Sequence, residues 1–240
     1  MVVGIEVGAR CDRCAGSRQD EPVSTDKHGA KEAPVHQTRR YVLRPDTTAD
    51  DVDEYAQVYG WPVVHQNDRD RENQVDGQII WATEGHPLRE RHLGALALHY
   101  IVDATSGIGY IVVTGEDQGF ADSLALAAAR YLNTWTVKEL YREYDEADAV
   151  RAVGQSVLRL GLAAPPDFDE GVFGRIADAM SRRDPAIRYS ALWGASYTGY
   201  WQFVEPIREL AEGEPEDWIR DRARSVIDAF ESAREEGSIR

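Results

Sequence analysis

Two groups of imidazole and carboxylate side chains could support acid–base chemistry in this chain. His99 and Asp103 lie four residues apart on an expected strand, which places both on one face, where the carboxylate would raise the imidazole pKa. A polar run nearer the N-terminus adds His65, Asp68 and Asp70. These five residues are the candidate acid and base groups of an enzyme. The competing interpretation is structural: a partly buried strand histidine, a turn aspartate and a solvated, self-neutralising loop.

Metal and cofactor chemistry finds little support in the spacing of the ligand-type residues. Cys11, Cys14, His28 and His36 resemble a zinc finger set, but their last two intervals are 13 and 7 residues. A finger uses about 12 and 3 to 5. The chain also has no glycine-rich phosphate loop, dinucleotide fingerprint or nucleophile elbow. We therefore expect neither a metal nor a cofactor.

Aromatic residues are concentrated in one stretch of the C-terminal half. Tyr189, Trp193 and Tyr197 recur at every fourth position of an expected helix, and Tyr200 and Trp201 follow at once. The opposite face of that helix is also apolar. Because a helical core needs only one apolar face, the aromatic face is free to make another contact. The stripe would cover a neighbouring unit of the same chain, a second subunit, a partner protein or a ligand. These five residues are the candidate binding surface.

Composition narrows the partners that the chain can have. There are 42 acidic against 27 basic residues over 240 positions, a formal charge of -15 that repels phosphate backbones. No apolar stretch approaches the roughly 20 residues of a membrane span, and only two cysteines occur, as in a reducing compartment. We expect a cytoplasmic protein without nucleic-acid or membrane partners. Arginine outnumbers lysine 24 to 3, which indicates GC-rich, actinobacterial coding.

The first half of the chain predicts a flexible tail over residues 1–37 and a small α+β domain over 38–133. A strand ends before Pro45, and Thr47 or Thr48 can cap the helix that follows. Residues 65–76 show no apolar period and are expected to be a loop. Three β-rich runs and a closing helix follow, with the last two runs forming a hairpin: 78–83, 96–103, 108–114 and 119–132. In the closing helix, the expected core face is Phe120, Leu124, Ala127, Ala128 and Tyr131.

The second half, residues 134–240, predicts helices alone and contains a degenerate repeat. Val150-Arg151 recurs as Ile187-Arg188 and as Ile219-Arg220, at offsets of 37 and 32 residues. Asp184-Pro185 introduces the second copy. The pattern resembles HEAT-like (armadillo-type) repeats over roughly residues 146–236. That resemblance implies a helical solenoid in which Arg151, Arg188, Arg220 and Asp184 link neighbouring repeats.

Taken together, these features predict an α+β unit, a small hairpin-containing sheet with packed helices, followed by an all-α HEAT-like unit. The favoured function is a protein-binding or scaffold module that meets a partner protein or second subunit through the aromatic helix face. The alternative is an enzyme, or an essential enzyme subunit, of specialised natural-product metabolism. Its pocket would lie between the two units and take an amine or other cationic small molecule. The sequence alone does not decide whether the chain is catalytic.

Overall fold

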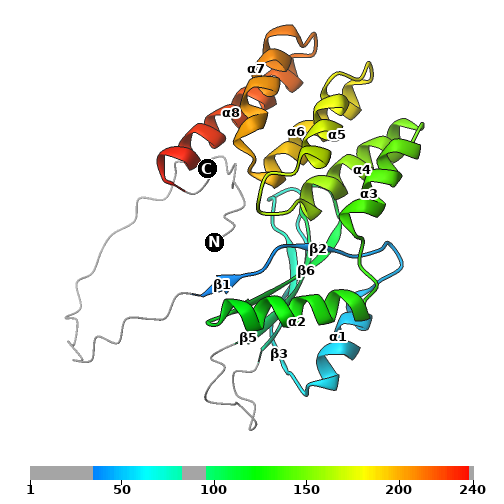
Figure 1. The fold of residues 1–240 in the computed structure, drawn as a ribbon, viewed down its shortest axis with the longest axis vertical. Coiled ribbons are helices and arrows are strands. Elements are labelled where there is room, and N and C mark those ends of the chain that lie inside the picture. The colour runs from blue at the N-terminus through cyan, green and yellow to red at the C-terminus, as the bar shows by residue number, and fades with distance from the viewer. Residues whose placement is uncertain (1–34, 83–95, 238–240) are drawn as a thin grey trace, which may run out of the picture.

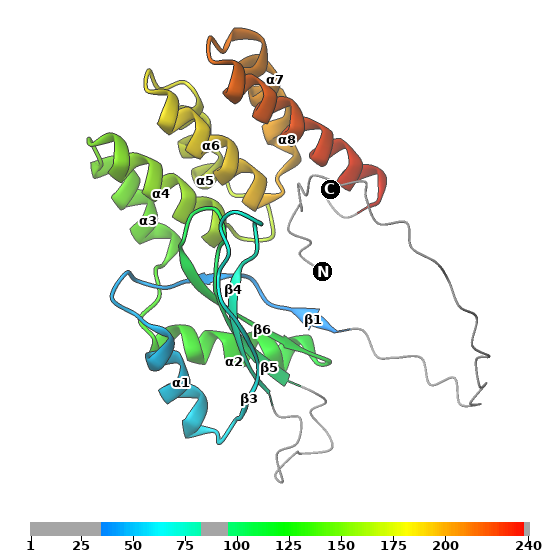
Figure 2. The ribbon, with the colours of Figure 1, turned by 180° about the vertical axis from the view of Figure 1, so that it is seen from behind.

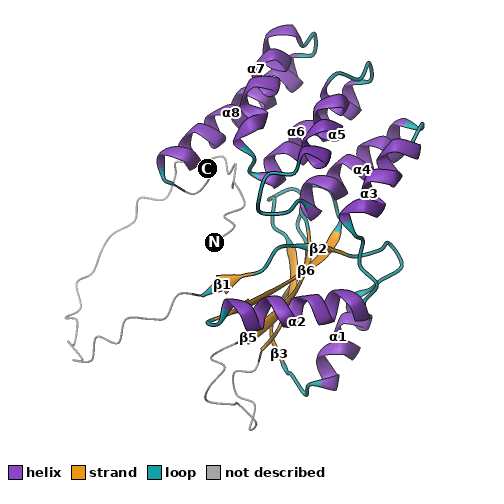
Figure 3. Ribbon diagram, viewed as in Figure 1, coloured by secondary structure: helices purple, strands orange, loops and turns teal. Residues whose placement is uncertain are grey.

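The computed structural model describes residues 35–82 and 96–237. The expected tail lies outside the described residues except for its last three positions, as do Cys11, Cys14 and His28 of the candidate zinc set. Strands occupy one part of the molecule and stacked helices the other (Figure 1 and Figure 3). The expected α+β class, with helices alone after residue 134, is thus present in the described chain.

One antiparallel sheet runs through the first half, with the order β1-β6-β5-β4-β3 and with β2 also pairing with β6. Its strands are β1 (His36–Gln37), β2 (Tyr41–Val42), β3 (Val63–Asn67), β4 (Gly77–Ala82), β5 (Leu96–Val102) and β6 (Gly109–Gly115). The predicted hairpin is β5 and β6, which pair along their whole length. Its turn contains Gly107 at φ +71°, a left-handed conformation that glycine adopts without strain.

Two strands differ from the predicted pattern. His36 and Gln37 belong to the sheet as β1, paired with the end of β6, although residues up to 37 were expected to be tail. His65 to Asn67 belong to the edge strand β3, paired with β4, instead of to a loop. β3 is exposed along most of its length, so it lacks the alternation of apolar and polar residues that reveals a half-buried strand.

Two helices cover one face of the sheet: α1 (Ala49–Val58) and α2 (Gln118–Tyr131). Thr48 caps α1 as predicted, in a capping box with Asp51. Leu98 and Trp81 are buried beneath these helices in one hydrophobic core. The core face of α2 is rotated from the predicted one, since Phe120 and Tyr131 are exposed. Small residues dominate the buried face, which consists of Ala121, Leu124, Ala125, Ala128 and Ala129.

The second half is a stack of antiparallel helix pairs above the sheet (Figure 1). Its helices are α3 (Val137–Glu146), α4 (Val150–Ala163), α5 (Glu170–Met180), α6 (Pro185–Thr198), α7 (Val204–Gly213) and α8 (Asp217–Glu235). A short 3-10 helix, η1 (Trp201–Phe203), precedes α7. Within the stack, α4, α6 and α8 lie side by side in one layer (Figure 2). None of the helices in the described ranges has both the length and the apolarity needed to cross a membrane.

The sheet and the helical stack share a hydrophobic core. Ile101 and Val112, on the sheet face opposite α1 and α2, belong to the same cluster as Val157 and Leu192 of the helices. Val42 of β2 is fully buried in that cluster. The described parts of the two predicted domains are therefore packed against each other through apolar side chains.

Candidate functional site

The aromatic residues around α6 divide between the interior and the surface. Tyr200 is buried, and its hydroxyl donates to the carbonyl oxygens of Pro165 and Asp167 at 2.8 and 2.9 Å. Tyr200 therefore contributes to the core. Tyr189 and Trp193 remain partly exposed on the side of α6 that faces α8.

Tyr197 connects α6 to the sheet. Its hydroxyl donates to the Asp103 carboxylate at 2.7 Å, and the guanidinium of Arg40 donates to its carbonyl oxygen at 3.0 Å. Burial, together with the Asp103 charge, raises the pKa of the Tyr197 phenol, so it stays protonated. Figure 2 shows the β5–β6 turn, where Asp103 lies, against the sheet-facing end of α6. The structure therefore shows Tyr197 joining α6 to the sheet of the same chain.

Local sequence signals hold α6 in place. Asp184 accepts from the Ala186 amide as the N-cap, Pro185 is the first helical residue, and Gly199 ends the helix at φ +67°. With both ends fixed, side chains four residues apart fall on one face. Tyr189 and Trp193 meet in this way, with ring centroids 6.5 Å apart.

Two residues of α8 complete this partly exposed cluster. Trp218 is 48% exposed and its ring centroid lies 4.8 Å from that of Tyr189. The guanidinium carbon of Arg222 lies 3.6 Å from the centroid of the Trp193 ring. We call these four residues, Tyr189, Trp193, Trp218 and Arg222, the α6–α8 aromatic face. Sequence analysis identified only the α6 members. The four-residue spacing of Trp218 and Arg222 was the available signal for the other two.

Arg222 lacks a charged partner within the part of the chain that the structure describes. No ion pair or hydrogen bond connects it to another described residue, and its Nε and Nη2 atoms are buried without a partner. Burial lowers the pKa of its guanidinium. The indole Nε1 of Trp193 is likewise buried and unpartnered. Trp201 lies farther along the chain, with Arg234 stacked 4.1 Å from its ring centroid.

His99 on β5 and Asp103 just beyond its end, the candidate acid–base pair, do not form a hydrogen bond with each other. The two imidazole nitrogens of His99 lie 3.0 Å from Gln78 Nε2 and 2.9 Å from Thr114 Oγ1. Asp103 is buried and accepts hydrogen bonds from Ser106 and Tyr197. Burial lowers the pKa of His99 to about 4, so the expectation that Asp103 would raise this pKa is wrong.

The other three candidate groups lie on β3 and in the polar segment that follows it. His65 contacts Asn67 at 3.0 Å on the exposed edge strand. Asp68 is exposed. Asp70 closes a turn by accepting hydrogen bonds from the Asn73 amide groups, which lower the pKa of Asp70. The described structure therefore does not gather the five candidate acid and base groups around one reacting position.

A small pocket lies where the sheet meets the helical stack. It contains about 20 Å³ of open space, close to the volume that one ordered water needs. Its lining comes from the β1–β2 segment, the end of α4 and the end of α6: Gln37, Thr38, Arg39, Arg40, Leu162, Ala164, Pro165, Pro166, Tyr197 and Thr198. None of the five candidate acid and base residues lines it, and its charged residues are arginines. The enzyme alternative places an acid-lined pocket for a cationic substrate between the two units, and this pocket is not lined by acids.

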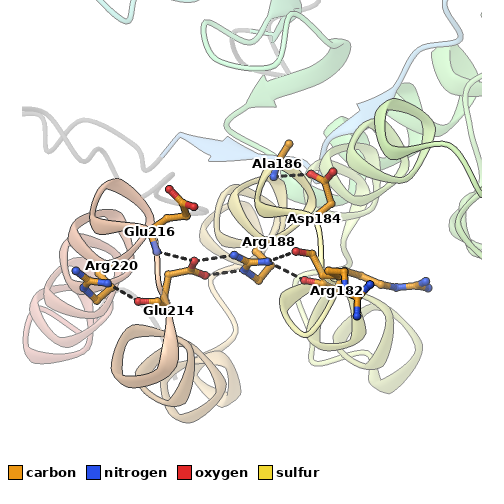
Figure 4. A network of polar contacts seen from close by, with 8 residues as sticks. Arg182, Asp184, Ala186, Arg188, Glu214, Glu216 and Arg220 are labelled. Atoms are coloured by element: carbon orange, nitrogen blue, oxygen red, sulfur yellow. Dashed lines mark hydrogen bonds and ion pairs between the residues drawn. The ribbon is translucent and has the colours of Figure 1, made fainter.

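The opposite ends of the helices carry a shallow groove of about 380 Å³ between the α5–α6 and α7–α8 turns. A buried ion pair forms its base, where Arg188 donates to both carboxylate oxygens of Glu214 at 2.6 and 2.7 Å (Figure 4). Arg188 also donates to the carbonyl oxygens of Arg182 and Arg183. These contacts satisfy both charges, so the groove is built around a structural pair.

No metal-binding group was found among the described residues: nowhere in residues 35–82 and 96–237 do three or more His, Cys, Asp or Glu side chains form a set that could hold an ion. Comparison of the chain with protein-family models, with curated proteins and with solved structures found no match. The function is therefore argued from the site alone.

Proposed function

We propose that the chain is a protein-binding or scaffold module whose contact surface is the α6–α8 aromatic face. The observation that carries this proposal is the partly exposed cluster of Tyr189, Trp193 and Trp218 around a guanidinium that has no acidic partner among the described residues. Tryptophan, tyrosine and arginine are the residues most enriched among the energetic centres of protein interfaces. Trp201 stacks with Arg234 farther along α8 and lies outside this face, and Tyr197 and Tyr200 are engaged within the chain.

We further propose that the helical half, residues 134–240, is a HEAT-like unit attached to the α+β unit of residues 38–133. Its support is the stacking of consecutive antiparallel helix pairs and a repeat arginine, Arg188, that bonds the turn of the next pair through Glu214. The pattern departs from the family at two positions. Asp184 caps its own helix, and Arg151 is exposed without a described side-chain partner. Such units present extended helix surfaces to partner proteins.

The test compares partner binding by the full chain and by variants of this face. Proteins captured from native cells by the wild-type chain are purified and titrated directly against the Tyr189→Ala/Trp218→Ala double variant. We expect at least tenfold weaker binding, because truncating interface anchors typically costs more than 1 kcal/mol each. Circular dichroism should show an unchanged helical signal, since neither side chain is fully buried.

The matched control is Phe120→Ala, which removes an exposed aromatic side chain of α2 far from the helical layer. It should bind the same partners as the wild-type chain. Equal affinity of wild type and double variant for every directly titrated partner would reject the proposed surface.

The enzyme alternative has weaker support. Its five candidate groups, His65, Asp68, Asp70, His99 and Asp103, are spread over separate hydrogen-bonded positions. A cationic ligand at the aromatic face would also meet Arg222, whose guanidinium already covers the Trp193 ring. A binding role therefore accounts for more of the described surface than a catalytic one does.

A further inference from the structure

Three unpartnered N–H groups meet at the α6–α8 aromatic face. They are Nε and Nη2 of Arg222 and the indole Nε1 of Trp193, and none has a hydrogen-bond acceptor in the described chain. The two side chains are stacked, with 3.6 Å between the guanidinium carbon and the ring centroid. Buried donors without acceptors are rare in folded proteins because each one gives up its hydration without compensation. Their presence side by side indicates a missing acceptor.

Among the residues that the structure describes, no carboxylate pairs with Arg222. The electrostatic neighbours that act on its guanidinium are the phenols of Tyr189 and Tyr197. On its own helix, the positions three and four residues away carry no acid: Trp218, Ile219, Ser225 and Val226. Other described arginines also lack an acidic partner, including Arg234 on the same helix, which stacks on Trp201. Among the described arginines, Arg222 is the one whose side-chain nitrogens are buried without a hydrogen-bond acceptor.

The neighbouring arginines of α8 show the usual arrangement. Arg220 donates to Asp217 and to the carbonyl oxygen of Glu214, and Arg224 lies 3.3 Å from Asp221. Arg222 alternates with them along the sequence, yet it points to the aromatic rings of α6. Arg222 is therefore held over the rings of the aromatic face, whereas Arg220 and Arg224 are paired with acids of their own helix.

We propose that the α6–α8 aromatic face recognises a carboxylate of an acidic segment in the partner protein, with Arg222 as the receptor of the charge. This inference rests on the proposed binding function and specifies its ligand chemistry. The aromatic rings of Tyr189, Trp193 and Trp218 contact the apolar neighbours of the bound acid. The guanidinium donates to the carboxylate after a rotation of the Arg222 side chain, which gives up part of the stacking on Trp193 but breaks no hydrogen bond of the described residues.

A carboxylate fits the face better than a phosphate group does. Readers of phosphorylated segments gather several arginines at one point, whereas here Arg220 and Arg224 are already paired. A single planar guanidinium matches the two oxygens of one carboxylate. The apolar rings beside Arg222 favour a peptide in which one acidic residue lies between apolar residues. A long acidic run is disfavoured because the negative charge of the protein repels it.

The experiment titrates the full-length chain with an acetylated, amidated peptide of sequence Leu-Glu-Leu-Glu-Leu. The readout is the nuclear magnetic resonance signal of the Trp193 indole N–H, assigned with Trp193→Phe. We expect a saturable shift with this peptide and none with the Leu-Gln-Leu-Gln-Leu analogue, which has the same shape without the charge. Because this comparison uses the wild-type protein, it does not depend on whether a variant folds.

Arg222→Gln should weaken peptide binding at least tenfold, and the matched variant Arg224→Gln should stay within twofold of wild type. Equal shifts with both peptides, or equal losses in the two variants, would overturn carboxylate recognition. A saturable shift with inorganic phosphate alone would identify phosphate as the ligand instead, and a shift that depends on protein concentration without peptide would identify a second copy. A partner found by its dependence on Tyr189 and Trp218, but unaffected by Arg222→Gln, would leave the proposed function standing and remove this inference.

Discussion

At the scale of single residues, burial of polar groups dominates the electrostatics of the chain. His99 lies on the sheet face that the helical stack partly covers, and burial lowers its pKa to about 4. Its two nitrogens are occupied by Gln78 and Thr114, which suit a neutral imidazole. Asp103 is held at the junction by Ser106 and Tyr197. The network around His99 therefore favours its neutral form.

His99 makes folding stability depend on pH in a predictable direction. The unfolded imidazole titrates near 6.5, so between pH 6.5 and about 4 the unfolded chain binds a proton that the folded chain does not. Stability is therefore constant above about pH 7 and falls as the pH decreases through this window. We expect the His99 contribution to cost on the order of 2 kcal/mol at pH 5. Urea unfolding of wild type and His99→Gln at pH 7.5 and pH 5 measures it, and the variant should lose less stability.

The control for this measurement is His65→Gln. His65 is exposed on the edge strand, so its replacement is a matched histidine substitution that removes no buried imidazole. Parallel profiles for His99→Gln and wild type would show that His99 is not buried in its neutral form.

At the scale of elements, close helix contacts fix the spacing of the stack. A Cβ atom at Gly161 of α4 would lie 2.3 Å from the backbone oxygen of Gly194 in α6. The two helices therefore approach too closely for any side chain at this crossing. Gly161→Ala should lower the free energy of unfolding by about 2–3 kcal/mol, because the backbones must separate. Denaturant unfolding followed by circular dichroism measures the change.

Gly174 of α5 provides the comparison for the same substitution, since a Cβ atom there meets nothing within 4 Å. Gly174→Ala should stabilise the chain by about 0.5–1 kcal/mol, because alanine restricts the unfolded backbone and favours the helix. A loss of stability in both variants would contradict this account, because the loss at Gly161 could then no longer be assigned to the α4–α6 contact.

The Arg188–Glu214 pair joins α6 to the turn before α8. The carboxylate is fully buried, so Arg188→Met should lower the free energy of unfolding by about 3 kcal/mol by leaving that charge without a partner. Chemical denaturation measures the loss. Glu214→Gln added to Arg188→Met should recover part of it. Arg151→Met, at the exposed equivalent position of the first repeat copy, should change stability by less than about 0.5 kcal/mol.

The sequence contained enough local information to predict most of these elements, but less of the site. The β5–β6 hairpin, the Thr48 cap and the Asp184-Pro185 helix start follow from short-range patterns, and all three are present. β3 was missed because both of its faces are exposed. Arg222 was missed because its contact with Trp193 joins two helices, and no periodicity in one helix reveals it. The spacing of His99 and Asp103 also did not show their partners. His99 contacts the neighbouring strands through Gln78 and Thr114, and Asp103 bonds to its own turn and to α6.

At the scale of the whole molecule, the question is whether the α+β and helical parts unfold separately. Ile101, Tyr110 and Val112 of the sheet lie in the same core as the helices of the stack. The Tyr197–Asp103 hydrogen bond crosses the same junction. If either part unfolded alone, it would expose this shared surface on the other. We therefore expect both parts to unfold in a single cooperative transition.

Hydrogen exchange measured peptide by peptide tests this expectation, because it reports the opening free energy of β5 and β6 separately from that of α4 and α6. Both regions should exchange with the same highest free energy in wild type. Val112→Ala removes buried methyl groups from the sheet side and should lower that value by about 1–2 kcal/mol in the strands and in the helices alike. Strands that lose protection while α4 and α6 keep theirs would mean that the two parts are independent domains. The shared core would then be a docking surface between them, and the helical stack, with its α6–α8 aromatic face, would fold without the sheet.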